Sequence, residues 1–269
     1  MTENWCKMAI DPSDRIYGLW DELADLPLAQ TRTSINLLFR QVSGWIGADN
    51  AFWVGVVRVR AEEHAREDIL YGWRLRAAER WRPQTEENQE FIRKVLAHME
   101  RDPGMSTREV IRQAGAFRTY RLRDGFVDFK AFSKTPQYEM YFKQGGITDR
   151  IWCVFPVNQD AESLICFDRI RRRRRFTPEH AQLVAQTLRG IKWFHRQLLL
   201  NHGLLVGKTP LSPAHRRLLA QLLTNKAEKE IADTLGLSPA TVHKYVTDIF
   251  RSFNVTNRPG LMTLWMGGI

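Results

Sequence analysis

The sequence contains little cysteine, which limits the metal and redox chemistry open to it. The three cysteines are Cys6, Cys153 and Cys166. No pair has CxxC spacing and no histidine cluster lies nearby, so a zinc site is not expected. Cys153 and Cys166 lie in apolar, strand-like runs, and we interpret them as small buried side chains rather than redox sensors.

Long hydrophobic runs are also missing. The N-terminal stretch MTENWCKMAIDPSD has no apolar core of the kind that a signal peptide needs. The longest apolar run, AFWVGVV at 51–57, is far shorter than the ~20 residues of a membrane-spanning helix. We therefore expect a cytoplasmic protein without a membrane partner.

Motifs of common enzymes are absent as well. No GxSxG, HExxH or Gly-rich phosphate loop occurs, and the histidines form no recognisable catalytic group. We predict that the protein is not an enzyme and uses no cofactor or metal. An enzyme is the alternative.

What the sequence has in excess is positive charge. The 269 residues carry a formal net charge of +10, and 207–269 hold eight Lys or Arg against four Asp or Glu. This balance suggests a polyanionic partner. Five consecutive arginines, Arg171–Arg175, indicate a solvated loop, with a supplementary phosphate contact as the alternative.

The first part of the chain has the pattern of an α+β domain. Apolar residues at helical spacing predict helices at 14–26, 31–46 and about 86–100. Four segments have the composition of strands, and 69–76 alternates, with Ile69, Tyr71, Trp73 and Leu75 on one face. The predicted strands are 51–59, 69–76, 150–157 and 163–170. An antiparallel sheet flanked by helices is typical of a sensory domain.

A connecting helix and a short linker follow. Thr177-Pro178-Glu179 is a helix start, and the apolar pattern predicts one continuous helix over 178–201. GLLVGKTPL then reads as a linker. We therefore divide the chain into a sensory domain (1–202), a linker (203–210) and a C-terminal domain (211–269).

The C-terminal segment predicts four helices and a sharp corner. In EKEIADTLGLSPATVHKYV, one helix ends at Gly236, and Ser238 caps the next. Small Ala232 lets the two helices approach closely. The third helix then projects its first turns outward, as a helix that enters a DNA major groove does.

Residues 211–266 resemble the LuxR-type DNA-binding domain of bacterial transcription regulators. The matching stretches are Leu211-Ser212-Pro213, Lys229-Glu230-Ile231-Ala232, Leu235-Gly236-Leu237-Ser238-Pro239, Thr241-Val242, Ile249-Phe250-Arg251 and Val255. The family commonly has Glu at position 215, Gly at 225 and 254, and often Lys at 243, where this chain has His215, Asn225, Asn254 and His243. Asn tolerates a positive φ, so both Asn substitutions fit a helix end.

The resemblance implies which residues contact DNA. By position, His243, Lys244 and Thr247 would face base edges, and Lys229, Ser238, Thr241, Tyr245 and Arg251 would more often hold phosphates. In this family the fourth helix often pairs two copies, and Leu261, Leu264 and Trp265 could supply that surface. A homodimer would read a pseudo-palindromic operator, and an activator would also contact RNA polymerase.

The domain that precedes the DNA-binding domain decides what is sensed. No phosphoacceptor pattern and no GxxxxGK[ST] occurs. The order of elements resembles a GAF-type or PAS-like sensory domain, and an acyl-homoserine-lactone receptor domain stays open. Aromatic residues could line a small-molecule pocket, and Tyr71, Trp73 and Trp152 are the candidates.

We therefore expect a sequence-specific transcription regulator controlled by a small molecule. The alternatives are an acyl-homoserine-lactone-type quorum-sensing receptor, a regulator whose N-terminal domain only dimerises or binds a protein, and a protein like a sigma factor. The predicted strands argue against the last, which would need a helical polymerase-binding region.

Overall fold

The computed structural model describes residues 13–59, 68–81, 86–172 and 174–267. Cys6 and His64 lie outside these ranges. The chain before residue 171 contains one sheet and short to medium helices. The strands are β1 (Asn50–Arg58), β2 (Trp73–Arg80), β3 (Arg118–Arg121), β4 (Ile147–Asn158) and β5 (Ala161–Ile170). The helices are α1 (Asp14–Asp25), η1 (Leu28–Gln30), α2 (Thr31–Ile46), α3 (Glu86–Arg101), α4 (Gly104–Arg112), α5 (Phe129–Phe132), α6 (Pro136–Tyr138) and η3 (Glu139–Lys143).

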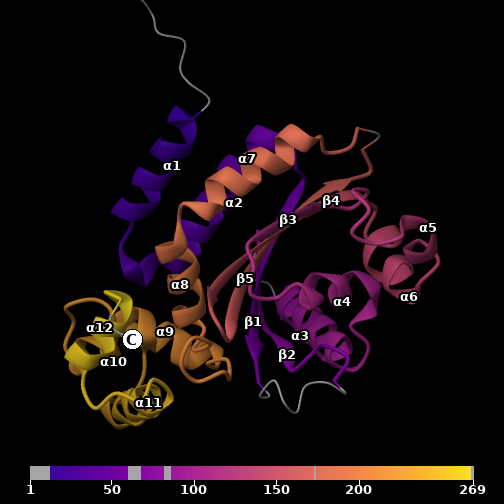
Figure 1. Ribbon diagram of the computed structural model, residues 1–269. Coiled ribbons are helices and arrows are strands. Elements are labelled where there is room, and N and C mark those ends of the chain that lie inside the picture. Colours follow the sequence, from indigo (N-terminus) through magenta and orange to yellow (C-terminus); the bar gives the residue numbers. More distant parts are fainter. Residues whose placement is uncertain (1–12, 60–67, 82–85, 173, 268–269) are drawn as a thin grey trace, which may run out of the picture.

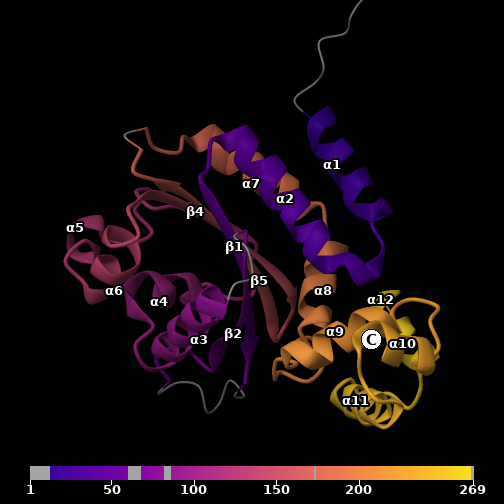
Figure 2. The same cartoon turned by 180° about the vertical axis from the view of Figure 1, so that it is seen from behind.

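The five strands form one antiparallel sheet in the order β2-β1-β5-β4-β3. Every second side chain faces the same side, so each central strand contributes to two apolar cores. Helices α1 and α2, with the later helices α7 (Pro178–Arg189) and α8 (Lys192–Asn201), cover one face, and α3 to α6 lie over the other (Figures 1 and 2). The predicted α+β fold with an antiparallel sheet is therefore confirmed.

The predicted strand at 69–76 is wrong at its start. Residues 69–72 form a turn, and β2 begins only at Trp73. Tyr71 has a φ of 49°. Tyr71 and Ile69 are 45% and 46% exposed, while Leu70 between them is buried. The turn conformation breaks the alternation that the sequence pattern predicts.

The predicted helix at 178–201 is also wrong in one respect, because it is interrupted. Helix α7 ends at Arg189 and α8 begins at Lys192. At Gly190 a side-chain carbon would lie only 2.2 Å from Trp20, whose indole donates a hydrogen bond of 2.9 Å to the Thr187 carbonyl. Close packing of Trp20 from α1 therefore coincides with the break.

The C-terminal part contains the four predicted helices. They are α9 (Pro213–Leu222), α10 (Glu228–Leu235), α11 (Pro239–Ser252) and α12 (Arg258–Trp265). Their inner faces form a separate apolar core, which includes Leu218, Ile231, Val242 and Leu261. Leu200 of α8 is buried in this same core, so the two parts of the chain are packed against each other.

Among the residues that the structure describes, no helix has the length and apolar character needed to cross a membrane.

Candidate nucleic-acid interface and ligand cavity

The corner between α10 and α11 is built by local backbone chemistry. Gly236 has a φ of 64°, and its N–H donates to the Ala232 carbonyl, which ends α10. Ser238 then caps α11 by accepting a hydrogen bond of 3.1 Å from the Thr241 N–H, with Pro239 at the first helical position. Ala232 is buried at the crossing of the helices. This is the helix-turn-helix geometry that the sequence predicts.

The face of α11 opposite the core carries the residues expected to read bases. His243, Lys244 and Thr247 are all exposed, while Val242 and Val246 on the inner face are buried. The His243 side chain is 74% exposed, and its Nδ1 lies 3.4 Å from the Glu228 carboxylate of α10. These side chains are therefore free of the core and lie on one outward surface.

The residues expected to hold phosphates surround that surface. Lys229, Ser238 and Arg251 are exposed, and Arg251 donates a hydrogen bond of 2.9 Å to Asp248. Thr241 is half-buried, and its hydroxyl lies 2.8 Å from the Ser238 hydroxyl. Ser238 therefore also caps α11, and Arg251 also forms a surface ion pair with Asp248.

Tyr245 is held differently from the others. It is half-buried, and its ring centroid lies 4.7 Å from that of His215 on α9. The His215 Nδ1 lies 2.6 Å from the Ser212 hydroxyl at the start of the same helix. His215 thus occupies the space between α9 and α11 and fixes the direction of Tyr245.

Of the two Asn residues expected at helix ends with positive φ, one meets that expectation. Asn254 has a φ of 52° just after α11. Asn225 is exposed in the turn between α9 and α10 and has no positive φ. The turn is instead held by Arg258, which donates to the carbonyls of Leu222, Thr224 and Lys226.

The dimerisation surface expected on α12 is wrong in its residues. Leu261, Leu264 and Trp265 are 0%, 8% and 7% exposed, because they fill the core of their own domain. The exposed side of α12 instead presents Thr263, and Met266 just after the helix is 76% exposed.

The arginine run lies at the opposite end of the molecule from α11 (Figures 1 and 2). Arg172 is bound to Asp49, with 2.5 Å between Nη2 and Oδ1. Burial alone would raise the pKa of Asp49, but the hydrogen bond and charge of Arg172 outweigh it and lower that pKa. Arg172 therefore anchors this part of the chain away from the candidate DNA surface.

A cavity of about 450 Å³ lies between the sheet and the helices on the α3 side. Apolar side chains from β1, β2, β4 and β5 form its floor, and residues of α3, α4 and η3 form its roof. The residues of the floor include Phe52, Leu75, Ala78, Trp152 and Leu164. A concave, mostly apolar site with a few polar groups is typical of a small-molecule binding site.

One wall of the cavity carries a buried ion pair. Arg150 of β4 and Asp168 of β5 are directly opposite in the sheet, and the guanidinium donates to both carboxylate oxygens, at 2.5 and 3.1 Å. Asn50 donates a third hydrogen bond of 2.9 Å to Asp168. Burial lowers the pKa of Arg150, but the charge of Asp168 more than offsets this and raises it. The guanidinium therefore stays charged beside the Asp168 carboxylate.

Aromatic rings enclose the cationic partner of this pair. The Arg150 guanidinium carbon lies 4.8 Å from the ring centroid of Phe52, 4.6 Å from that of Phe142 and 5.4 Å from that of Trp152. Such cation–π contacts hold the guanidinium against the wall.

Two polar atoms in the same cavity have no hydrogen-bond partner within the described part of the chain. They are the Asn50 Oδ1 and the Tyr141 hydroxyl, both buried. Buried polar groups are nearly always satisfied by protein, water or ligand. The cavity therefore offers one free acceptor and one free hydroxyl.

The aromatic candidates for the pocket have different positions. Trp152 lines the cavity. Tyr71 is exposed in the turn before β2, and Trp73 is buried in the core outside the cavity lining. Sequence reasoning missed Arg150 and Asp168, although each is a charged residue inside an otherwise apolar strand, which is a usable signal of a buried polar site.

Two of the cysteines lie in the core of the sheet domain. Cys153 and Cys166 are both buried, as expected. Burial raises the pKa of the Cys153 thiol to about 12 and the pKa of the Cys166 thiol well above its usual value. Both are therefore uncharged thiols. Among the described residues, no three His, Cys, Asp or Glu side chains are grouped so that they could hold a metal ion.

Three solved structures share similarity with the chain. The VqsR LBD domain from Pseudomonas aeruginosa has 15% identity and a TM-score of 0.47, covering 68% of this chain and 96% of that one. Escherichia coli SdiA has the same identity and TM-score over 94% of this chain and 95% of that one. SdiA in complex with octanoyl-rac-glycerol has 16% identity and a TM-score of 0.46 over 96% and 95%. No curated protein sequence matches the chain.

The family comparison concerns the C-terminal helices. Residues 209–265, which include α9 to α12, match the model of the bacterial regulatory proteins of the luxR family. The match spans the corner at Gly236 and the outward face of α11. Helices α9 to α12 therefore form a helix-turn-helix domain of the luxR family of bacterial regulatory proteins.

Proposed function

We propose that the chain is a sequence-specific regulator that binds double-stranded DNA through α11. The observation that carries this proposal is the outward face of α11, where His243, Lys244 and Thr247 are exposed after a sharp corner. Helices at such corners enter the major groove with their N-terminal turns. Lys229, Ser238, Thr241, Tyr245 and Arg251 surround this face and would contact phosphates.

We further propose that the regulator acts in the cytoplasm as a homodimer, with 1–202 as a sensory domain, 203–210 as a linker and 211–269 as a DNA-binding domain. Two copies related by a two-fold axis would read half-sites roughly 10 base pairs apart. An activator would use the same complex to contact RNA polymerase.

The DNA proposal is tested by selecting bound fragments from genomic DNA with the purified full-length chain. We expect a shared pseudo-palindromic motif among the recovered fragments. Recovery without a motif, together with an affinity that simply collapses as salt increases, would contradict sequence-specific reading and leave only charge-driven binding.

For the sensory domain, we infer that a small molecule binds in the cavity beside Arg150 and Asp168. The apolar floor and roof favour an acyl or aryl body. Among the polar atoms of the cavity, the Asn50 Oδ1 and the Tyr141 hydroxyl have no hydrogen-bond partner within the described residues. The ligand's head group should therefore carry both an acceptor and a donor, as amides and hydroxyl-bearing esters do.

The charge balance of the wall favours a head group without net charge. Asp168 already neutralises Arg150 through two hydrogen bonds. An added carboxylate would leave one uncompensated negative charge in a buried site, which is costly. Uncharged ligands should therefore bind better than anions of the same length.

Octanoyl-rac-glycerol, the ligand named for one SdiA structure, is a suitable uncharged probe. We expect it to raise the unfolding temperature of the chain, because a ligand that binds only the folded state stabilises it. Octanoate, with the same acyl chain and a charged head, is the matched control and should raise the unfolding temperature much less. Ala78→Phe, which fills the cavity floor, should abolish the shift.

The opposite order of the two probes would contradict the uncharged head group and identify Arg150 as an anion site. A shift that survives in Ala78→Phe would show that the probe binds elsewhere. If neither probe shifts the unfolding temperature at saturating concentration, the acyl class of ligand is excluded for this cavity.

A further inference from the structure

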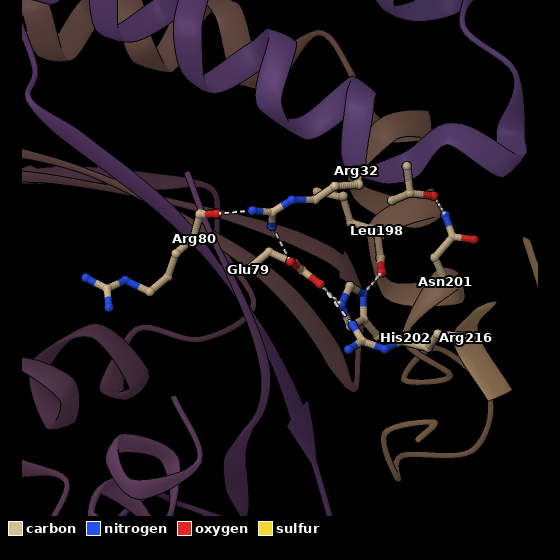
Figure 3. A network of polar contacts seen from close by, with 8 residues as sticks. Arg32, Glu79, Arg80, Leu198, Asn201, His202 and Arg216 are labelled. Atoms are coloured by element: carbon tan, nitrogen blue, oxygen red, sulfur yellow. Dashed lines mark hydrogen bonds and ion pairs between the residues drawn. The ribbon is translucent and has the colours of Figure 1, made fainter. Parts of the chain in front are cut away.

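A single buried carboxylate joins the sensory part of the chain to the DNA-binding domain. Glu79, near the end of β2, has a side chain that is only 13% exposed. Its Oε2 lies 2.5 Å from Arg32 of α2, and its Oε1 lies 2.9 Å from Arg216 of α9 (Figure 3). Two elements of the sensory part and one helix of the DNA-binding domain therefore meet at one side chain.

A histidine belongs to the same cluster. His202, at the end of α8, places its Nε2 3.0 Å from the Glu79 Oε1 and its Nδ1 2.8 Å from the Leu198 carbonyl (Figure 3). Both ring nitrogens of His202 therefore lie within hydrogen-bond distance of an oxygen acceptor. Burial alone would raise the pKa of Glu79, but His202, Arg216 and Arg32 outweigh it and lower that pKa to about 2.

The surroundings of the cluster hold it in place. Trp53 of β1, which pairs with Glu79 in the sheet, lies with its ring 4.6 Å from that of His202. Arg32 also donates a hydrogen bond of 2.6 Å to the Arg80 carbonyl. Further along α8, Arg196 donates to the Leu264 carbonyl at 2.9 Å. The DNA-binding domain is thus attached to the sheet at β2 and to α8.

The strand that carries Glu79 also forms part of the ligand cavity. β2 is an edge strand, paired only with β1. Its pairing shifts between Gly55 and Val56, which leaves Arg76 as an extra residue. As a result, Leu75 and Ala78 both face the cavity, while Glu79 faces α2 and α9 on the other side of the sheet. A displacement of β2 by a ligand would reach Glu79 directly.

We propose that Glu79 is a clamp that holds the DNA-binding domain in one orientation and that β2 transmits occupation of the cavity to this clamp. The first part rests on the contacts of Glu79 alone. The second part rests on the proposed function of the cavity. A ligand that moves β2 would loosen or tighten the contact with Arg216 and so change how α11 is presented to DNA.

Hydrogen exchange of the full-length chain tests the clamp. Arg216→Ala removes the contact from α9 and leaves Glu79 bonded to Arg32 and His202. We expect the segment 203–211, whose Leu211 N–H is bonded to the His202 carbonyl, to exchange about tenfold faster or more in this variant. Glu79→Gln should give the same result, while exchange within α10 and α11 should not change.

The adjacent Arg217 offers a matched control, because it is exposed on the same helix. Arg217→Ala makes the same change of charge and should leave exchange at 203–211 unchanged. Unchanged exchange at 203–211 in both Arg216→Ala and Glu79→Gln would overturn the clamp. A change of equal size in Arg217→Ala would also overturn it, because the effect would then be one of general charge.

The link to the cavity is tested without any ligand. Ala78→Phe, or the smaller Ala78→Leu if the first does not fold, should alter exchange at 203–211 in the wild-type background. The same change should have no added effect in the Arg216→Ala background, where the clamp is already open. The coupling between cavity and clamp would be overturned if the Ala78 substitution does not alter exchange at 203–211. It would also be overturned if the substitution alters exchange equally in the wild-type and Arg216→Ala backgrounds. Failure of octanoyl-rac-glycerol to bind would contradict the proposed ligand class. The exchange measurements at 203–211 do not depend on that ligand.

Discussion

Replacing Glu162 by Gln is expected to lower the free energy of unfolding by about 3–5 kcal/mol, which is the usual cost of breaking a buried ion pair. Glu162 and Arg118 are 0% and 5% exposed, and two hydrogen bonds of 2.8 Å join them. The substitution would leave the Arg118 guanidinium charged and buried without its counter-ion. Denaturant unfolding of the two proteins measures the difference.

The effect should be large because the pair also positions α4. Arg118 donates to the Val110 carbonyl at 2.7 Å and to the Ala116 carbonyl at 2.7 Å, and Glu162 accepts from the Gly115 N–H at 2.8 Å. Glu139→Gln, at an exposed pair with Lys143, is the control and should change stability by less than about 0.5 kcal/mol. Similar losses of stability in both variants would show that the buried pair stabilises the fold no more than the exposed pair does.

Acidification from pH 6.5 to pH 4 is expected to remove about 3 kcal/mol of stability through His195 alone. His195 is buried, and burial lowers its pKa to about 4, partly opposed by the hydrogen bond to the Leu188 carbonyl at 3.0 Å. The Ser163 hydroxyl lies 2.7 Å from the other ring nitrogen and accepts a hydrogen bond from Trp53 at 2.8 Å. The folded protein therefore holds a neutral imidazole.

The direction of this pH dependence follows from proton binding at His195 in the folded and unfolded states. Between pH 6.5 and 4 the unfolded chain binds a proton at His195 that the folded chain does not bind, so stability falls as pH falls. The contribution is complete above pH 6.5 and lost as pH decreases through this window. His195→Gln, which cannot take up the proton, should show a flatter dependence of the free energy of unfolding on pH. An equally steep dependence in this variant would contradict the assignment.

Much of the fold could be predicted because local patterns decide it. The strand pattern of β4 and β5 survives in the structure, since their apolar residues fill the two cores on either side of the sheet. The four C-terminal helices are marked by caps at Ser212 and Ser238 and by Gly236, whose roles are local.

The failures have causes that lie outside the local sequence. The break at Gly190 coincides with Trp20, a residue about 170 positions away, so no pattern within 178–201 could announce it. The turn that includes Tyr71 replaces a strand because β1 pairs only from Trp73 onward. The residues of α12 expected to pair two copies are buried because they belong to the apolar core that Leu200 of α8 also enters.

One candidate site could be predicted from the local sequence, and the others depend on tertiary packing. The outward face of α11 follows from helical periodicity, so the sequence places His243, Lys244 and Thr247 together. The cavity depends on which strands are neighbours. Arg150 and Asp168 meet only because β4 and β5 pair in one register, and Glu79 meets Arg216 only through tertiary packing.

The central claim is that α11 reads bases, and a specificity ratio tests it most directly. This ratio is the affinity for a selected site divided by the affinity for a scrambled sequence. It is measured at one salt concentration for the wild type, Lys244→Ala and Lys229→Ala. We predict that Lys244→Ala lowers the ratio roughly tenfold or more, as loss of a base contact should. Lys229→Ala should weaken both affinities equally and leave the ratio unchanged. A ratio that is unchanged in Lys244→Ala, with both affinities merely reduced, would contradict base reading at this position of α11.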